Sequence, residues 1–476
     1  MLTPSMQHLP LWRALPAALA SALALAAGAC SVLPVREGTA ATPAAGGRQA
    51  ARHAEVHGSH GRLTPQARRK VLDGVAAEGG AESLARHIAV LTAASELPLL
   101  AGNEAGLLVD GPATFDAMFS AIEAARKTVF LESYIIEDES VALRLSELLI
   151  RKQAQGVAAY VMYDAVGSIR TDTAYFDTLR SHGVAVCEFN PVNPAKRIGY
   201  WDITQRDHRK ILVVDGRVAF AGGINISAVY SSGSMSRRRA AKVADDDANG
   251  WRDTQIRLRG PAVTALDGLV RTVWMAQGCE AALPPVAPKQ PPAGDRLVQI
   301  IPSGPDGDDN RIYGALLSAI DASTRSVHLS MAYFAPGPDM VAALCDAAAR
   351  GVDVSLILPS VSDFSPVLYA GRSYYTQLLE AGVRIHELRG AVLHAKTAVI
   401  DGVWSTVGSS NMDWRSFTDN NEVNAVVLGE DFGREMEQVF RRDIAASSPV
   451  TAEAWAHRPL AARAREWFAR LLERLW

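Results

Sequence analysis

Residues 208–216 read HRKILVVDG, and residues 394–402 read HAKTAVIDG. In both segments Lys follows His by two residues, and Asp follows that Lys by five. The match extends further, because Asn225 and Asn411 each stand 17 residues after the histidine of their own segment, in the sequences GGIN and GSSN. The chain has 476 residues and only 11 histidines. This repeat therefore predicts a duplicated fold in which both copies contribute to one chemical site.

The pattern of expected strands and helices around the two segments also occurs twice. β-Branched runs alternate with helical patterns over residues 90–282 and again over 295–446, which is typical of α/β layers with a mostly parallel, mixed sheet. Two pseudo-symmetric α-β-α lobes are expected, and residues 283–294, with five prolines, read as a linker between them. The expected elements of the first lobe are strands at 128–136, 157–163 and 183–186 and helices at 141–155 and 173–181. Those of the second are strands at 326–334, 352–358 and 382–385 and helices at 339–350 and 373–381.

The spacing within each segment has a physical meaning. Residues two apart on a strand project to the same face, so His208 and Lys210 point together, as do His394 and Lys396. The Asp-Gly pair that follows favours a tight turn, and the returning strand brings the asparagine of that copy back beside its histidine. Two such hairpins would surround one pocket with imidazoles, ammonium groups and amides. The formal charge of this pocket suits a phosphate.

With these motifs the chain resembles the phospholipase D superfamily, whose HxKxxxxD motif, followed by GxxN, occurs twice in the lipid-acting members. The resemblance covers roughly residues 90–446. The segments WRDT at 251–254, VGSSNMDWRS at 407–416 and NEV at 421–423 are most similar to bacterial cardiolipin synthases. The resemblance implies an active site at the interface of the two lobes and a phosphohistidine intermediate, with no metal and no other cofactor. It implies a phosphatidyltransferase that joins two phosphatidylglycerols to cardiolipin and releases glycerol.

The resemblance also implies roles for individual residues. One imidazole attacks phosphorus and the other protonates the leaving alcohol; family analogy favours His208 as the nucleophile, although the symmetric sequence leaves the order open. Asp253 and Glu422 resemble the carboxylates that orient the imidazoles, with a surface salt bridge as the alternative. The expected catalytic residues are His208, Lys210, Asp215, His394, Lys396 and Asp401, and the expected phosphate ligands are Asn225, Ser409 and Asn411. Because Asp215 and Asp401 fall at the hairpin turns, a structural role is favoured for these two.

Composition narrows the range of functions. There are 48 Lys and Arg against 51 Asp and Glu, for a net charge of -3. This balance gives no basic field for a polyanion, so we expect no nucleic-acid partner, and a metal-independent nuclease is disfavoured. Two competing functions stay open: a phospholipase D hydrolase that releases phosphatidic acid, and a non-catalytic lipid-binding lipoprotein. The acceptor alcohol depends on pocket shape and water exclusion, which no motif encodes.

The amino-terminal segment reads as a targeting signal. Residues 14–27 are apolar but too few to cross a bilayer of roughly 30 Å, which predicts a signal peptide over residues 1–29. Ala27-Gly28-Ala29-Cys30 resembles a lipoprotein cleavage site with Cys30 acylated; plain secretion and a retained anchor are the alternatives. Residues 30–89 are expected to form a flexible tether, disordered to about residue 65, with a short helical lead-in. The expected location is the bacterial cell envelope, in contact with a membrane surface.

Three further segments complete the expectations. Cys187, Cys279 and Cys345 lack metal-ligand spacing, and we expect them to be core residues rather than parts of a disulfide scaffold. Residues 231–249 are expected to form an exposed loop. Residues 447–476 are expected to end in an amphipathic helix, in which the leucines and aromatic residues of 460–476 lie opposite the arginines. Such a helix can lie in a membrane interface or pack against the second lobe.

Overall fold

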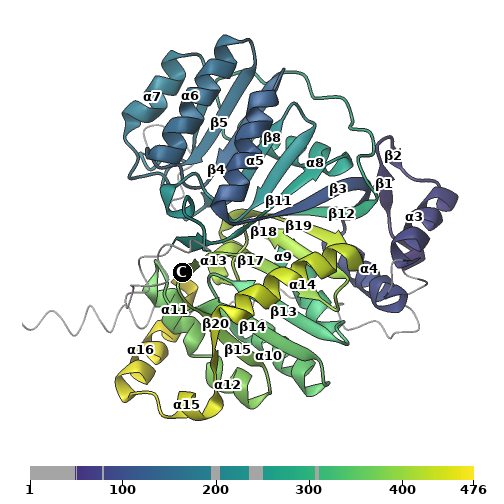
Figure 1. Ribbon diagram of the computed structural model, residues 1–476, viewed down its shortest axis with the longest axis vertical. Helices are drawn as coiled ribbons and strands as arrows, with labels where there is room; N and C mark the ends of the chain where they lie inside the picture. Colours follow the sequence, from purple (N-terminus) through teal and green to yellow (C-terminus); the bar gives the residue numbers. More distant parts are fainter. Residues whose placement is uncertain are drawn as a thin grey trace, which may run out of the picture. The chain divides into compact units, whose positions relative to one another are not determined.

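The computed structural model describes residue 49 and residues 51–77, 80–193, 204–234, 250–305 and 310–475 (Figure 1). These residues fall within one compact unit, Ala41–Trp476. The expected signal peptide, Cys30 and residues 235–249 of the expected loop lie outside the described residues.

The first copy is built on a seven-stranded sheet with the order β6-β5-β4-β8-β9-β11-β3. The first three of these strands run parallel, and every later pair is antiparallel. Four helices accompany these strands. In chain order the elements are β3 (Leu99–Val109), α5 (Asp110–Ala124), β4 (Thr128–Ser133), α6 (Ser140–Ala154), β5 (Ala158–Asp164), α7 (Thr173–Ser181), β6 (Ala185–Phe189), β8 (Lys210–Val214), β9 (Val218–Gly222), β11 (Thr254–Arg259) and α8 (Pro261–Ala276).

The second copy repeats this order as β15-β14-β13-β17-β18-β19-β12, again with three parallel strands followed by antiparallel pairs. Its elements are β12 (Arg296–Ser303), α9 (Arg311–Asp321), β13 (Ser326–Met331), α10 (Gly337–Ala349), β14 (Asp353–Pro359), α11 (Ser365–Arg372), α12 (Tyr375–Glu380), β15 (Arg384–Leu388), β17 (Lys396–Ile400), β18 (Trp404–Gly408), α13 (Trp414–Thr418), β19 (Asn420–Leu428) and α14 (Glu430–Ala445). The duplicated α/β fold with a mixed sheet is therefore confirmed.

The two sheets join edge to edge. Strand β3 pairs with β11 along one side, and its beginning pairs with β12, where Leu100 lies opposite Val298. Side chains from both copies also share one hydrophobic core, which includes Val213, Ile256, Val407 and Val427. Because apolar burial of this kind is the main favourable term in folding, the shared core fixes one copy against the other.

Part of the expected tether is ordered. Strand β1 (Val56–Gly58) runs parallel to β3, and β2 (Gly61–Arg62) returns beside it. Helices α3 (Pro65–Ala77) and α4 (Ala81–Ser95) follow. The expectation of disorder to about residue 65 is therefore wrong for residues 51–64. In strand β1 only Val56 is fully buried. A strand with one buried side chain has no alternating apolar pattern, so it could not be predicted from the sequence.

The cysteines also differ from expectation. Cys187 in β6 and Cys279, just beyond α8, form a disulfide with their Cα atoms 5.7 Å apart, and Cys345 is a free thiol. All three are half-buried, so the prediction that they are core residues is wrong. The pairing arises because α8 returns the chain to strand β6 after 92 residues, a proximity that only the tertiary fold creates.

The carboxyl-terminal region contains more than one helix. Strand β20 (Ser447–Val450) pairs with β15, and α15 (Ala452–Ala456), α16 (Leu460–Leu471) and a short 3-10 turn, η5 (Glu473–Leu475), follow. Figure 1 shows α16 beside α11 at the edge of the second copy. Within the described ranges, no helix has the length and apolar content needed to cross a bilayer.

Candidate active site

Both copies line one cavity of about 550 Å³. His208 and Asn225 come from the first copy, and His394 and Asn411 come from the second. The two imidazoles of the repeated motif therefore reach the same pocket, although 186 residues separate them (394 − 208).

Each histidine backbone is held by the opposite copy. His208 N–H donates to the carbonyl of Asn421 at 3.0 Å, and His394 N–H donates to the carbonyl of Arg252 at 2.8 Å. Two short parallel ladders flank these bonds: β7 (Arg206–Asp207) pairs with the start of β19, and β10 (Trp251–Arg252) pairs with β16 (Val392–Leu393). Strands β8 and β17 begin only at the motif lysines, so each histidine lies where its hairpin meets the other copy.

The carboxylates cross between the copies in the same way. His208 Nδ1 lies 2.9 Å from Glu422 Oε1, and His394 Nδ1 lies 2.6 Å from Asp253 Oδ2. Both carboxylates are completely buried. A carboxylate at Nδ1 holds a proton on that nitrogen and leaves Nε2 as the nitrogen available to the pocket. Asp253 and Glu422 each lie against the ring of the other copy, a contact through which a carboxylate can orient an imidazole.

The two carboxylates are supported differently. The Ser409 hydroxyl donates to Glu422 Oε2 and is fully buried. Gly223 stands at the corresponding place in the first copy, where a Cβ would lie 2.3 Å from Asp253 Oδ1. Space occupied by Asp253 therefore explains the glycine. The Ser409 hydroxyl is directed toward Glu422 in β19, and Ser409 does not line the pocket.

The motif lysines lie behind the histidines. Lys210 Nζ donates to the His208 carbonyl and Lys396 Nζ donates to the His394 carbonyl, each at 2.5 Å; Lys396 Nζ also lies 2.9 Å from His394 Nδ1. Burial lowers the pKa of Lys210 to about 7, against the opposing charge of Glu422. Burial likewise lowers the pKa of Lys396 to about 8, against Asp253. Each ammonium therefore loses its proton at a lower pH than a solvent-exposed lysine does.

The same environment acts on the imidazoles and their carboxylates. Burial lowers the pKa of His208 and, still more strongly, that of His394, where the charge of Lys396 adds to the effect. Burial raises the pKa of Asp253 to about 6 in spite of Lys396. Burial would also raise the pKa of Glu422, but its interaction and hydrogen bond with His208 and the charge of Lys210 outweigh it and leave this pKa lowered. In the empty pocket, both rings are therefore neutral at pH 7.

The two asparagines differ in their contacts. Asn225 Oδ1 accepts from the Ile135 N–H at 3.1 Å, and its amide donates to the Tyr230 hydroxyl at 3.3 Å. Asn411 Oδ1 is buried and accepts no hydrogen bond from the part of the chain that the structure describes. Both side chains line the pocket, where an amide can donate to a non-bridging phosphate oxygen.

The motif aspartates lie at the far end of each hairpin. The Asp215 carboxylate accepts from three successive backbone N–H groups, those of residues 126–128, and Asp401 accepts from those of residues 324–326. Asp401 also accepts from the Ser83 hydroxyl and contacts His87 of α4. Neither aspartate lines the pocket. Each aspartate ties its hairpin turn to the start of a neighbouring strand of its own copy, β4 for Asp215 and β13 for Asp401, which favours the structural role.

Several pocket residues were not predicted. The Tyr230 hydroxyl lies 3.1 Å from His394 Nδ1, and the Trp251 ring lies 4.9 Å from the His394 ring. The Tyr134 ring meets His208 edge to face at 4.9 Å. Trp251 begins the WRDT segment that carries part of the family resemblance, whereas the tyrosines follow no spacing that the sequence reveals. These aromatic walls restrict the rotation of both imidazoles.

Comparisons with known proteins agree with this geometry. A family profile described as "Cardiolipin synthase, PLD-like domain" matches residues 316–444. The chain is 36% identical over 383 residues to a cardiolipin synthase of Geobacillus thermodenitrificans, covering 79% of this chain and 73% of that protein. It is 36% identical over 361 residues to cardiolipin synthase A of Pseudomonas entomophila, covering 75% and 72%. Among solved structures, the phosphatidylserine synthase of Haemophilus influenzae has the same fold, with a TM-score of 0.60 at 12% identity over 82% of this chain and all of that one.

A duplicated α/β fold that brings one HxKxxxxD histidine from each copy to a single pocket is the arrangement of a phospholipase D superfamily enzyme. Within that superfamily, the chain belongs to the cardiolipin synthase family, as the identity over most of both sequences shows.

Proposed function

We propose that this enzyme transfers a phosphatidyl group from one phosphatidylglycerol to another, which gives cardiolipin and glycerol. One observation carries the proposal: two imidazoles, each held at Nδ1 by a buried carboxylate of the opposite copy, line the same pocket. The names of the relatives support the choice of lipid.

The reaction proceeds in two balanced steps. His208 Nε2 attacks the phosphorus of the first phosphatidylglycerol, the bond from phosphorus to the glycerol oxygen breaks, and His394 gives a proton to that oxygen. A hydroxyl of the second phosphatidylglycerol then gives its proton to His394 and attacks phosphorus, and the P–N bond breaks. The anionic diester favours protonation of the buried imidazole and ammonium groups around it, so His394 takes up a proton from solvent when the substrate binds.

Lys210, Lys396 and the two asparagines are proposed to stabilise the charge that develops on the non-bridging oxygens. Preorganised donors of this kind usually make the largest single contribution to catalysis. In the absence of substrate, each ammonium is satisfied by the backbone carbonyl of its own histidine. Both lysines are therefore held in place before the anion enters.

Product analysis with labelled phosphatidylglycerol tests the proposal. We expect cardiolipin and free glycerol from the wild-type enzyme, with turnover unchanged by a chelator. His208→Ala and His394→Ala should each abolish turnover, whereas His457→Ala, at an exposed histidine, should not. A phosphorylated histidine trapped in the His394→Ala protein and absent from the His208→Ala protein would support the order of attack. Phosphatidic acid as the sole product would instead identify a hydrolase.

We further propose that the protein is an envelope lipoprotein anchored through Cys30 at a membrane surface. The sequence before Cys30 motivates the anchor, and the Cys187–Cys279 disulfide supports export, because such bonds persist mainly in oxidising compartments. Metabolic labelling with palmitate should mark the wild-type protein and the Cys345→Ala control but not Cys30→Ala. Label retained by Cys30→Ala would reject this anchor without affecting the proposed reaction.

A further inference from the structure

Helix α16 presents its apolar side to solvent. Leu460, Trp467, Phe468 and Leu471 are 79%, 64%, 60% and 54% exposed, and residues at these spacings share one helical face. Its opposite side, through Ala469, is buried against α11. An amphipathic helix on a globular protein normally buries its apolar stripe. Helix α16 instead exposes its apolar stripe, so the stripe is available to bind a membrane or another molecule.

This stripe continues to the mouth of the active-site cavity. Leu475 in η5 is 66% exposed and also lines that cavity. Eight of the eleven exposed large hydrophobic side chains in the described ranges lie either on α16 and η5 or on the cavity wall. We call these eight the apolar rim: Ile169, Val229, Phe364, Leu460, Trp467, Phe468, Leu471 and Leu475. Exposed apolar surface concentrated on one helix and on the cavity wall that its last turn joins marks an interaction site.

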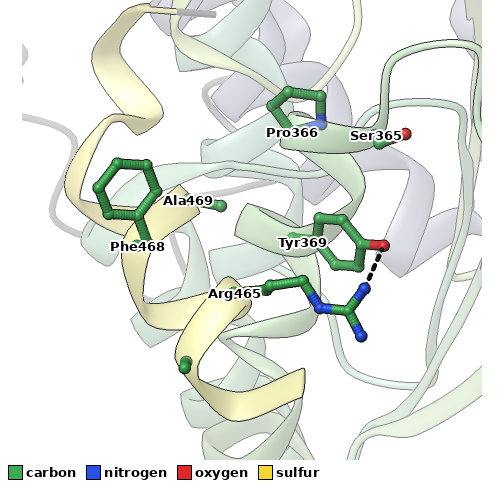
Figure 2. Close-up of a pocket in the computed structure, with 7 residues that line it drawn as sticks. Ser365, Pro366, Tyr369, Arg465, Phe468 and Ala469 are labelled. Carbon is green, nitrogen blue, oxygen red and sulfur yellow. Dashed lines mark hydrogen bonds between the residues drawn. The ribbon is translucent and has the colours of Figure 1, made fainter. Parts of the chain in front are cut away.

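A second apolar hollow lies under the rim. Figure 2 shows Phe468 and Ala469 of α16 facing Pro366 and Tyr369 of α11 across a cavity of about 410 Å³. Helix α11 also carries Val367, which lines the active-site cavity. The hollow is therefore next to the reaction pocket, and its apolar walls suit a hydrocarbon chain.

Positive charge borders the stripe. At about 100° per residue, Arg463 and Arg470 fall on one flank of the stripe and Arg465 on the other. The two acids of this segment are engaged within the protein: Glu466 is paired with Arg458, and Glu473 accepts from the Tyr374 hydroxyl. Apolar side chains flanked by arginines are the pattern of a helix that lies in the interface of an anionic bilayer.

We propose that the apolar rim docks the enzyme on an anionic phospholipid bilayer, with α16 in the headgroup layer and the mouth of the active-site cavity against the lipid surface. A lipid can then enter the pocket headgroup first without passing through water. The lipid nature of the substrate rests on the proposed function. The docking surface itself rests on exposure, charge and its continuity with the cavity.

Depth-dependent quenching tests insertion directly. Full-length protein is mixed with vesicles of phosphatidylglycerol and phosphatidylcholine that carry a spin-labelled acyl chain. We expect a quenched component of the tryptophan fluorescence that Trp467→Phe lacks. The difference isolates Trp467 whether or not the amino-terminal segment also binds the vesicle. Equal quenched components in the two proteins would overturn the proposal.

Turnover provides the second test. Leu460→Asp with Leu471→Asp, at two stripe residues that line neither cavity, should lower turnover on vesicles by about tenfold or more, because two apolar side chains lose their favourable burial. Turnover on a short-chain phosphatidylglycerol kept below its micellar concentration should be unchanged. The matched control is Met275→Asp on α8, since Met275 is 64% exposed but distant from the rim in sequence and not part of the cavity wall. It should leave both activities intact.

The outcomes separate the possible explanations. Equal loss of turnover on vesicles and on dispersed lipid would mean that α16 stabilises the pocket and does not bind the membrane. No loss on either substrate would mean that the apolar stripe has no role in turnover. Either result would overturn the proposal. A double variant that converts a dimer to a monomer in sedimentation, with lipid quenching unchanged, would assign the stripe to a second copy of the chain. Failure of the proposed function is distinct, because it removes product from both substrates while the quenching by lipid persists.

Discussion

At the scale of single residues, the site depends on an exchange between the two copies. Glu422 holds His208 and Asp253 holds His394, so each imidazole depends on a carboxylate from the other half of the chain. Neither copy could orient its own histidine by these contacts. This exchange gives a physical reason for keeping both copies in one polypeptide with a shared core.

A first prediction concerns this exchange. Asp253→Asn should lower kcat by about 10⁴-fold, as removing the charge that orients a catalytic imidazole does in other enzymes. The change should alter the ¹⁵N chemical shifts and tautomer of His394, in the opposite copy, and leave those of His208 unchanged. Glu422→Gln should give the converse result. Asp177→Asn, on an exposed carboxylate, is the control. Shifts confined to the histidine of the mutated copy would contradict the crossed arrangement.

A second prediction concerns pH. The pKa values of Lys210 and Lys396 are lowered to about 7 and about 8 in the empty site. Their positive charges are therefore lost as pH rises through these values, and capture of the anionic lipid weakens. We expect kcat/KM, which reports the free enzyme, to fall as pH rises through about 7 to 8, while kcat, which reports the complex, holds to higher pH because the bound phosphate favours the ammonium form. Parallel profiles of kcat and kcat/KM would contradict this prediction.

At the scale of elements, the hairpins explain why the motif contains an aspartate that is remote from the chemistry. Asp215 and Asp401 have positive φ, at 54° and 53°. The carboxylate of each accepts hydrogen bonds from backbone N–H groups at the start of the strand beside its hairpin. Because β8 lies against β4 and β17 lies against β13, these bonds set the register of the strand that carries the catalytic pair.

A third prediction follows for Asp401. Asp401→Ala leaves several buried donors unsatisfied, including the Ser83 hydroxyl, and should lower the free energy of unfolding by roughly 1–3 kcal/mol or more. The turnover of the folded protein should stay within a few-fold of wild type. The pKa of Asp401 is lowered in the fold, mainly by His87 and backbone N–H groups acting against burial. Its contribution is therefore present above the unfolded value near 3.8 and is lost as pH falls below it.

Urea denaturation at pH 7 and at pH 3 measures this contribution, with Asp177→Ala as a surface control. The difference between wild type and Asp401→Ala should shrink at the lower pH. A variant with normal stability and no turnover would contradict the structural role and return Asp401 to the chemistry.

The elements also show how far the sequence could be interpreted. The helix expected at 173–181 is α7 without any change of bounds, and the hairpins that follow His208 and His394 form as the spacing predicts. The motif residues were identifiable because their spacing is duplicated. Asp253 and Glu422 were identified through the family resemblance, but their crossing between the copies and the contact of Tyr230 with His394 were not, because these depend on the interface of the copies. The bond between Ser409 and Glu422 was not predicted either, because it depends on the pairing of two strands within the second copy. The disulfide and strand β1 were missed because nothing local in the sequence specifies either.

At the scale of the whole molecule, the Cys187–Cys279 disulfide closes a long loop of the first copy. Loop-closure entropy for a sequence separation of 92 corresponds to a stabilisation approaching about 4.7 kcal/mol, although measured values centre on about 2–4 kcal/mol. Neither cysteine lines the active-site cavity. The disulfide should therefore affect the stability of the fold and not the rate of catalysis.

Cys187→Ser with Cys279→Ser should thus lower the urea midpoint of the first copy and increase its susceptibility to proteolysis, with turnover per folded molecule unchanged. Cys345→Ser, at the free thiol, is the matched control and should behave as wild type. Reductant should reproduce the effect in wild type and have no effect on the double variant, because only the wild type has a disulfide that can be reduced.

The two copies share a hydrophobic core and a continuous sheet, so destabilising the first copy should also destabilise the second. Hydrogen exchange should therefore accelerate in β18 and β19 as well as in β6, and acceleration confined to β6 would show that the copies unfold independently.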